Sequence, residues 1–163
     1  MNISFEKVGD DRIKELAAMT NEIWHEYFPC ILSDEQIDYM VDKFQSEKAI
    51  TAQINDGYEY YFICKDGIPC GYMGLHCETE KMFLSKLYLK KEMRGLGIAG
   101  KAFDFIFTLT KNYGKGSVYL TVNKHNEHSI DVYKHKGFEI TDSVVTDIGS
   151  GYVMDDFIFQ KNL

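Results

Sequence analysis

The chain has 163 residues, of which 45% are hydrophobic and 26% are charged, and it carries a net charge of −7 at pH 7. These proportions are typical of one globular domain, and an acidic chain lacks the basic footprint on which general nucleic-acid binding relies. No apolar run approaches the roughly 20 residues that cross a bilayer, and no leader pattern precedes the first elements. We therefore expect a cytoplasmic protein without a membrane segment.

The first third of the chain is expected to be helical after one short strand. Apolar residues recur at helical spacing over Ile13–Phe28, and Pro29 should end that helix. Ser33 and Gln36 have the spacing of a capping box, in which the Gln36 side chain reaches back to the Ser33 amide. This box predicts a second helix, and a shorter third helix should follow over residues 47–55.

The middle of the chain predicts an antiparallel meander. Stretches rich in aromatic and β-branched residues indicate strands at Tyr58–Cys64, Pro69–Cys77 and Met82–Leu89. Asp66-Gly67 supplies the positive-φ positions of a hairpin turn between the first two strands. Strict alternation along the third strand places four side chains on one face: Phe83, Ser85, Leu87 and Leu89.

The pattern then changes to alternating helices and strands. A glycine-rich loop precedes a helix that should end near Gly114. The elements expected after it are a strand at Ser117–Val122, a helix at Glu127–Lys136, and strands at Phe138–Val145 and Tyr152–Gln160. We therefore predict a single α/β domain over residues 1–163, in which helices flank a mixed, mainly antiparallel sheet.

The four cysteines, Cys30, Cys64, Cys70 and Cys77, include no Cys-x-x-Cys pair. This spacing argues against a zinc or dithiol redox site, and we expect no metal site. The last three lie in predicted strands, where small core residues are the simpler interpretation. A nucleophilic cysteine is disfavoured because nothing marks an electropositive site around one.

The most informative segment is the loop Arg94-Gly95-Leu96-Gly97-Ile98-Ala99-Gly100-Lys101. It lies between a predicted strand and a predicted helix, and the free amide groups at the start of a helix form an anion site. Gly95 and Gly97 let the backbone approach a ligand oxygen closely. The loop is therefore expected to bind a phosphate-containing ligand.

The glycines of this loop match two nucleotide-binding patterns, each with a missing part. Gly95-x-Gly97-x-x-Gly100 fits a dinucleotide fingerprint, but the acidic residue expected about 20 positions later is absent. Gly95-x-x-x-x-Gly100-Lys101 fits a nucleoside-triphosphate loop, but Ala102 stands where a Ser or Thr should hold magnesium. A nucleotide-binding switch is therefore a minor alternative.

Two motifs together resemble the GNAT superfamily of N-acetyltransferases. Arg94-x-x-Gly97-x-Ala99 is similar to the family's loop for the pyrophosphate of acetyl-CoA. Downstream, Asn126-x-x-Ser129-x-x-x-Tyr133-x-x-x-Gly137-Phe138 is similar to the family's second cofactor motif. The N-terminal third and the tail resemble, less specifically, bacterial polyamine or small-amine acetyltransferases. The resemblance implies the GNAT fold and acetyl-CoA as cofactor.

The resemblance also implies roles for individual positions. Tyr133 is expected to protonate the departing thiolate as general acid, and backbone groups of Leu87 and Leu89 to pair with the pantetheine arm. Asn126 should cap its helix and face the same arm. The residues implied for cofactor binding are Leu87, Tyr88, Leu89, Arg94, Gly95, Leu96, Gly97, Ile98, Ala99, Gly100, Lys101, Asn126, Ser129, Tyr133 and Lys136.

The general base is not evident from the sequence. Many members of the family carry a glutamate on the strand that corresponds to Met82–Leu89, and this strand contains no acidic residue. Glu26, beside Trp24 on the first helix, is one candidate, although most charged side chains are simply solvated. The other candidates are His25, Glu78 and Glu80. The pair Asp155-Asp156 could add negative potential for a cationic amine.

The charge distribution favours a cationic acceptor. Residues 81–136 contain 11 Lys or Arg and 4 Asp or Glu, so a basic half could hold the cofactor and the acidic remainder the acceptor. The leading prediction is acetyl transfer from acetyl-CoA to a primary amine of a small molecule such as a polyamine, by direct attack on the thioester. The alternatives are a non-catalytic CoA-binding sensor and acetylation of a protein amine, and homodimer formation is left open.

Overall fold

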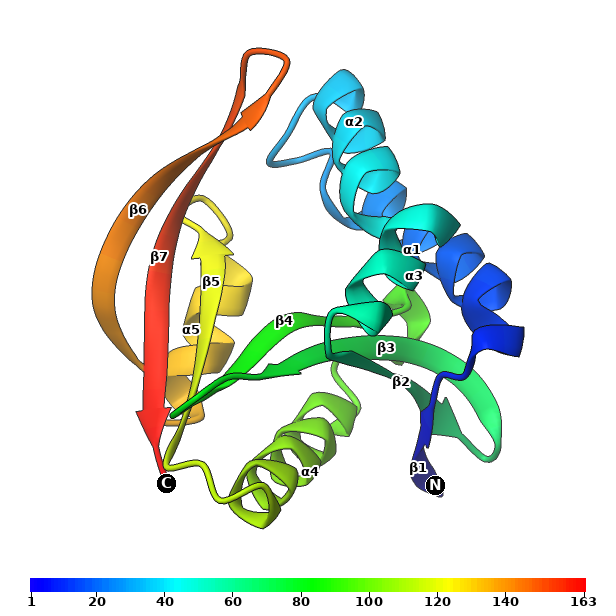
Figure 1. Ribbon diagram of the computed structural model, residues 1–163, viewed down its shortest axis with the longest axis vertical. Coiled ribbons are helices and arrows are strands. Elements are labelled where there is room, and N and C mark those ends of the chain that lie inside the picture. Colours follow the sequence, from blue (N-terminus) through cyan, green and yellow to red (C-terminus); the bar gives the residue numbers. More distant parts are fainter.

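The computed structural model describes residues 1–163 and contains one seven-stranded sheet in the order β1-β2-β3-β4-β5-β7-β6 (Figure 1). Neighbouring strands are antiparallel except β4 and β5, which are parallel. The strands are β1 (Ile3–Lys7), β2 (Tyr58–Lys65), β3 (Ile68–Cys77), β4 (Met82–Leu89), β5 (Ser117–Asn123), β6 (Glu139–Gly149) and β7 (Tyr152–Asn162). The helices are α1 (Ile13–Tyr27), α2 (Asp34–Gln45), α3 (Glu47–Asn55), α4 (Ile98–Asn112) and α5 (Glu127–His135), with 3₁₀ turns η1 (Asp10–Arg12) and η2 (Lys91–Met93).

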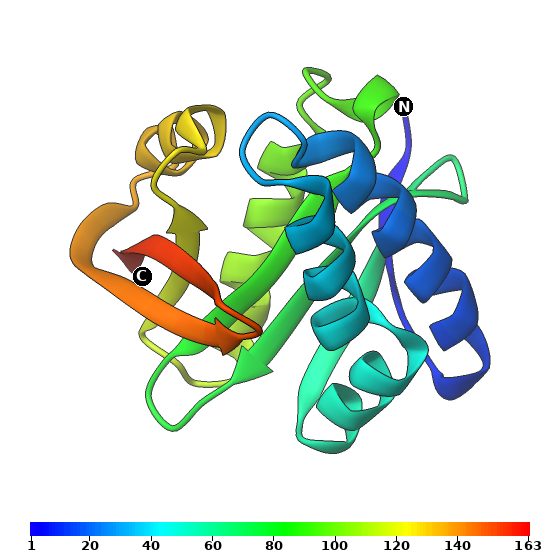
Figure 2. The same cartoon turned by 90° about the horizontal axis from the view of Figure 1, so that it is seen from above.

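Helices cover both faces of the sheet, which confirms the predicted α/β architecture. The apolar sides of α1, α2 and α3 pack on one face, against Tyr60, Phe62 and Tyr72. The helices α4 and α5 pack on the opposite face, and Tyr61 of β2 belongs to that second core. Figure 2 shows α1–α3 on one side of the strands and α4 on the other. None of the helices is both long and apolar enough to cross a bilayer.

The strands β4 and β5 separate soon after they begin. Their paired residues are Met82 with Val118 and Phe83 with Tyr119, and no pairing follows. The two halves of the sheet consequently open as a V, with α1–α3 on one arm and β5–β7 on the other (Figure 1). Backbone groups on the facing edges of β4 and β5 are thereby left for other partners.

A β-bulge at Ser85 changes which side chains of β4 share a face. In the register between β3 and β4, Ser85 is an extra residue without a partner. Leu87 and Leu89 therefore pack on the α4 side, and Lys86 and Tyr88 face the α1–α2 side. The predicted common face of Ser85, Leu87 and Leu89 was wrong, because a bulge shifts the alternation by one residue.

Two element ends also differ from the sequence predictions. Ser33 caps α2, because its side-chain oxygen accepts a hydrogen bond from the backbone amide of Gln36. The Gln36 side chain does not reach back to the backbone of Ser33; its Nε2 donates instead to Val153 O on β7, 3.2 Å away. The strands β6 and β7 extend further than predicted because a tight turn with Ser150 at φ 54° joins them. This long hairpin reaches α2, where Tyr39 Oη donates to Ile148 O at 2.6 Å.

Candidate active site

Two cavities meet inside the V between β4 and β5. The α2 cavity, of about 280 Å³, lies between α1, α2, β4 and β7, and its apolar lining includes Trp24, Phe28, Leu32, Met40, Phe44 and Met154. The α4 cavity, of about 300 Å³, lies between β4, α4 and α5, and its lining includes Leu87, Ala99, Phe103 and Val132. Tyr88, Ser129 and Tyr133 line both. Molecules bound in the two cavities would therefore meet at these three residues.

The α4 cavity is bordered by peptide groups of β4. The Lys90 amide donates to Cys70 O of β3, and residues of an antiparallel strand alternate in bonding their neighbour. The peptide groups of Leu89 and Leu87 therefore point toward the gap that β5 leaves. Arg94 occupies part of this gap, since Nη2 and Nε donate to Leu89 O at 3.0 and 3.2 Å. The peptide groups of Leu87 can bond an extended ligand.

The glycine loop presents a row of free amide groups at the N-terminus of α4. None of the amides of residues 95–100 donates a hydrogen bond within the chain. Gly95 and Gly97 have φ values of 77° and 80°, in the left-handed region that favours glycine, and Gly97 is the N-cap of α4. Lys136 Nζ lies 3.1 Å from the position that a Cβ on Gly100 would take. Free amides, the positive end of a helix dipole and an ammonium group together fit a pyrophosphate.

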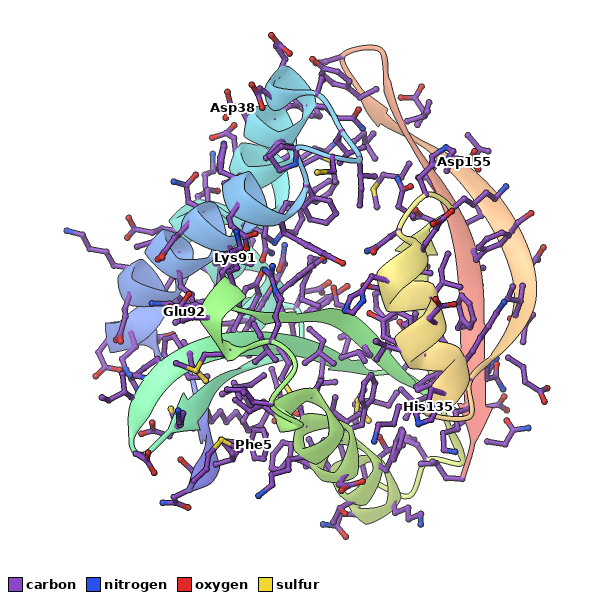
Figure 3. The ribbon with its side chains drawn as sticks, turned by 180° about the vertical axis from the view of Figure 1, so that it is seen from behind. Phe5, Asp38, Lys91, Glu92, His135 and Asp155 are labelled. Atoms are coloured by element: carbon purple, nitrogen blue, oxygen red, sulfur yellow. The ribbon has the colours of Figure 1, made fainter.

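Arg94 connects the loop to α1 through Glu26. It follows η2, whose Lys91 and Glu92 lie beside α1 in Figure 3. The two guanidinium Nη atoms bond the Glu26 carboxylate at 2.5 and 3.1 Å, and the guanidinium carbon lies 4.9 Å from the centre of the Tyr27 ring. Glu26 lines neither cavity. The role of Glu26 as a base stays a prediction, and its observed role is to hold Arg94.

Asn126 caps α5 as the sequence predicted. Its Oδ1 accepts a hydrogen bond from the Ser129 amide at 3.3 Å and another from Tyr27 Oη at 2.8 Å. Tyr27 Oη also lies 2.9 Å from Ser129 Oγ. Asn126 lines the α2 cavity, and Tyr27 lines the α4 cavity. The sequence indicated the cap, but it gave no sign of the partner from α1.

Tyr133 lies where the two cavities meet, and its ring is held by Phe103, Phe138 and Phe159. Burial, together with the nearby Tyr27, raises the pKa of Tyr133 well above the usual value of a phenol. The proton therefore stays on the hydroxyl across the neutral range. The hydroxyl donates to no other group of the chain, so it is free to bond a ligand. Its position between the two cavities suits the predicted proton donor.

The α2 cavity contains two charged side chains, Asp156 of β7 and Lys86 of β4. Burial and the neighbouring Asp155 raise the pKa of Asp156 to about 6, although Lys124 and Lys86 oppose this. Burial lowers the pKa of Lys86 to about 8, against the opposing effect of Asp156. At neutral pH a carboxylate and an ammonium group therefore face the same, largely apolar space.

The remaining predicted base candidates are bonded elsewhere. His25 Nε2 lies 2.5 Å from Asp38 Oδ1 on α2. Glu78 accepts a hydrogen bond from Tyr119 Oη at 2.6 Å, and Glu80 is an exposed turn residue. None of these residues lines either cavity.

The predicted cofactor residues divide into three groups. Those that line the α4 cavity are Leu87, Tyr88, Leu89, Arg94, Ala99, Ser129 and Tyr133. Those in or beside the loop are Gly95, Leu96, Gly97, Ile98, Gly100, Lys101 and Lys136, of which Ile98 buries its side chain in the core. Asn126 alone lines the α2 cavity and not the α4 cavity. Sequence reasoning missed Lys86 and the burial of Asp156. The one signal in the sequence is that Lys86 is the only charged residue of its strand, β4.

The chain is similar to known acetyltransferases in sequence and in fold. The sequence model described as the acetyltransferase (GNAT) family matches residues 16–138. An uncharacterized N-acetyltransferase of Lactobacillus delbrueckii subsp. lactis is 23% identical over 96% of this chain and 95% of the relative. An uncharacterized N-acetyltransferase of Mycobacterium bovis is 25% identical over 91% of this chain and 96% of the relative.

Solved structures share the fold over the whole chain. The PaiA N-acetyltransferase from Thermoplasma acidophilum, crystallised in complex with coenzyme A, superposes with a TM-score of 0.83 at 23% identity and full coverage of both chains. A GCN5-related N-acetyltransferase from Rhodopseudomonas palustris also gives a TM-score of 0.83, at 13% identity, with 100% of this chain and 97% of that one covered. Because the family match spans most of the chain, the protein belongs to the acetyltransferase (GNAT) family and is an N-acetyltransferase that uses acetyl-CoA.

Proposed function

We propose that the enzyme acetylates the primary amine of a small molecule held in the α2 cavity, while the pantetheine arm of the cofactor lies in the α4 cavity. The observation that carries this proposal is the meeting of the two cavities at Tyr88, Ser129 and Tyr133, in the gap between β4 and β5. An amine from one side and a thioester from the other can approach each other there. Such positioning of two reactants is a large part of catalysis.

The cofactor proposal rests on the loop and on β4. The free amides of residues 95–100 and the Lys136 ammonium would hold the pyrophosphate, and the peptide groups of Leu87 would bond the arm. The Thermoplasma acidophilum relative, crystallised with coenzyme A, supports this placement by its fold. Acetyl-CoA supplies the acetyl thioester. Arg94 would hold the end of β4 through Leu89 O and adjoin the pyrophosphate.

Asp156 is the carboxylate that can receive the amine. It is 5% exposed and lies in the α2 cavity, whereas Glu26 is paired with Arg94 outside both cavities. Because its pKa is about 6, Asp156 is mostly ionised at pH 7 and can bind an ammonium group and accept a proton from it. Tyr133, with its proton retained and its hydroxyl free, would protonate the sulfur that leaves.

The walls of the α2 cavity favour a small acceptor over a protein. Aromatic and apolar side chains of α1, α2 and β7 surround a space of about 280 Å³, which is the scale of a metabolite. A polyamine fits the predicted cationic class at Asp156, but its second ammonium group would share the cavity with Lys86. A protein lysine or N-terminus would have to reach Asp156 inside this cavity.

A thiol-release assay with acetyl-CoA tests the proposal against spermidine, apolar amino acids and a lysine-containing peptide. Calorimetry with CoA and with magnesium-ATP should accompany it. We expect CoA to bind, ATP not to bind, and at least one small amine to release thiol faster than the peptide. CoA binding without thiol release on any amine would favour a sensor, and ATP binding without CoA binding would reject the cofactor assignment.

A further inference from the structure

Lys86 is the one cation in the α2 cavity, and it forms no ion pair within the chain, although Asp156 lies near enough to oppose the lowering of its pKa. Its side chain lies on the face of β4 that the Ser85 bulge turns toward α1 and α2. Its Nζ is 2.9 Å from Ser85 Oγ, which is a neutral partner. No carboxylate lies within 4.0 Å of it, whereas Lys7 and Lys124 each bond one at 2.8 and 2.9 Å.

Such a group is costly to keep in this setting. An ammonium group that loses water without gaining an anion pays a desolvation penalty, and the cavity around Lys86 is lined mainly by apolar side chains. Asp156 shares the cavity but forms no ion pair with Lys86. The two charges therefore face the cavity as separate sites, one cationic and one anionic.

We propose that the acceptor is a small amine that also carries a carboxylate, of the amino-acid class, with Lys86 binding its carboxylate and Asp156 its amino group. This inference rests on the proposed function, since it names the class of amine that enters the same cavity. An α-amino acid carries its ammonium and carboxylate groups on one carbon, which matches a cavity with one charge of each sign. A polyamine would instead bring a second ammonium group toward Lys86.

The rest of the cavity indicates which side chain such an amino acid would carry. Trp24, Phe28, Met40, Phe44 and Met154 form a continuous apolar wall from α1, α2 and β7. A side chain of leucine, methionine or phenylalanine would bury its apolar surface against this wall, and removing apolar surface from water favours binding. Lys86 therefore selects by charge, and this wall selects by shape and hydrophobicity.

The experiment compares each of three amino acids with the amine that lacks only its carboxylate. Leucine is paired with 3-methylbutylamine, methionine with 3-(methylthio)propylamine, and phenylalanine with 2-phenylethylamine, with spermidine as the polycation. Thiol release from acetyl-CoA gives kcat/KM for each, and the readout is the ratio of acid to decarboxylated amine. Lys86→Met removes the charge and keeps the length, and Lys7→Met, on β1, is the matched control.

We expect the wild type and Lys7→Met to prefer at least one amino acid over its amine by about tenfold or more, because a hydrogen bond to a charged group is stronger than one between neutral groups. In Lys86→Met this ratio should fall toward one. A wild-type preference for the decarboxylated amines or spermidine, or an unchanged ratio in Lys86→Met, would overturn the inference while leaving the amine acetyltransferase intact.

Calorimetry separates this failure from failure of the proposed function. If no amine releases thiol, the acceptor proposal is wrong, and the binding of the three amino acids then tests Lys86 directly. Binding that Lys86→Met weakens by about tenfold and Lys7→Met preserves would uphold the carboxylate site. No binding of any amino acid to the wild type would overturn it.

Discussion

Tyr27, at the end of α1, donates a hydrogen bond from its hydroxyl to Asn126 Oδ1, 2.8 Å away at the start of α5. These residues belong to opposite arms of the V, where β4 and β5 no longer pair. The same hydroxyl lies 2.9 Å from Ser129 Oγ. One side chain of α1 thus links the two halves of the protein beside Ser129, which lines both cavities.

Removing this link should loosen the two arms. Tyr27→Phe leaves Asn126 Oδ1 with the Ser129 amide alone, and we expect the free energy of unfolding to fall by about 1 kcal/mol, a typical net value for one hydrogen bond. Urea denaturation measures it. Tyr113→Phe, which removes a surface bond to Glu59, is the control. An equal or smaller loss for Tyr27→Phe would mean that the link contributes nothing specific.

Tyr133→Phe tests the proton donor. The ring contacts with Phe103, Phe138 and Phe159 remain, so the fold should be unchanged. We expect kcat to fall by roughly 10²-fold or more, as for loss of a general acid, with little change in the KM for acetyl-CoA. Steady-state kinetics at saturating substrates measures this, with Tyr119→Phe, outside both cavities, as control. Unchanged turnover would remove Tyr133 from the mechanism.

Asp156 should set the acidic limb of the pH–rate profile. Its pKa is raised to about 6 by burial and by Asp155, with Lys124 and Lys86 opposing, so activity should rise as pH increases through about 6 and the carboxylate forms. Asp156→Asn should lower kcat/KM by about 10²-fold and abolish that limb. The profile of Asp155→Asn should keep a limb, moved to lower pH. A limb retained in Asp156→Asn would assign it to another group.

The same shift predicts a cost in stability. The native state keeps the Asp156 proton up to about pH 6, whereas an unfolded aspartate loses it near 3.8, so the native state binds more protons between these values and stability falls as pH rises through them. The cost at pH 8 is on the order of 3 kcal/mol. Asp156→Asn should therefore gain stability relative to the wild type between pH 4 and pH 8, as urea denaturation at both pH values can measure. An unchanged difference would contradict the raised pKa.

Two matched glycines test the proposal that the glycine loop binds the pyrophosphate. Gly97 and Gly114 lie at opposite ends of α4 with φ values of 80° and 74°, and a Cβ on either would enter open space. Alanine at either position should cost about 1 kcal/mol of stability through backbone strain. Only Gly97→Ala should also weaken CoA binding, by about tenfold, because the loop amides move. Calorimetry decides, and equal CoA affinities of the two variants would argue against the loop as the pyrophosphate site.

The local elements followed from the sequence because their signals are local. The period of the apolar residues located α1 and α4, and Asp66-Gly67 located the hairpin between β2 and β3. The motif around Asn126 correctly indicated its cap. The sequence did not predict which side chains of β4 share a face. The bulge at Ser85 depends on the register with β3, and the alternation of residue types along β4 does not reveal it. The partner of the Gln36 side chain was likewise not predictable, because it lies on β7, 117 residues away in the sequence.

The amino-acid sequence by itself determined the family and predicted a cofactor loop, since the Arg94–Lys101 segment and the Asn126–Phe138 motif depend on backbone geometry that nearby residues fix. Only the tertiary structure decided which charges meet in the α2 cavity. Nothing in the sequence distinguishes the environment of the Glu26 carboxylate from that of Asp156. In the folded protein Glu26 pairs with Arg94, whereas Asp156 is buried in the same cavity as Lys86. The environment of a charge is set by segments far apart in the chain, and that environment gives Asp156 and Lys86 their shifted pKa values.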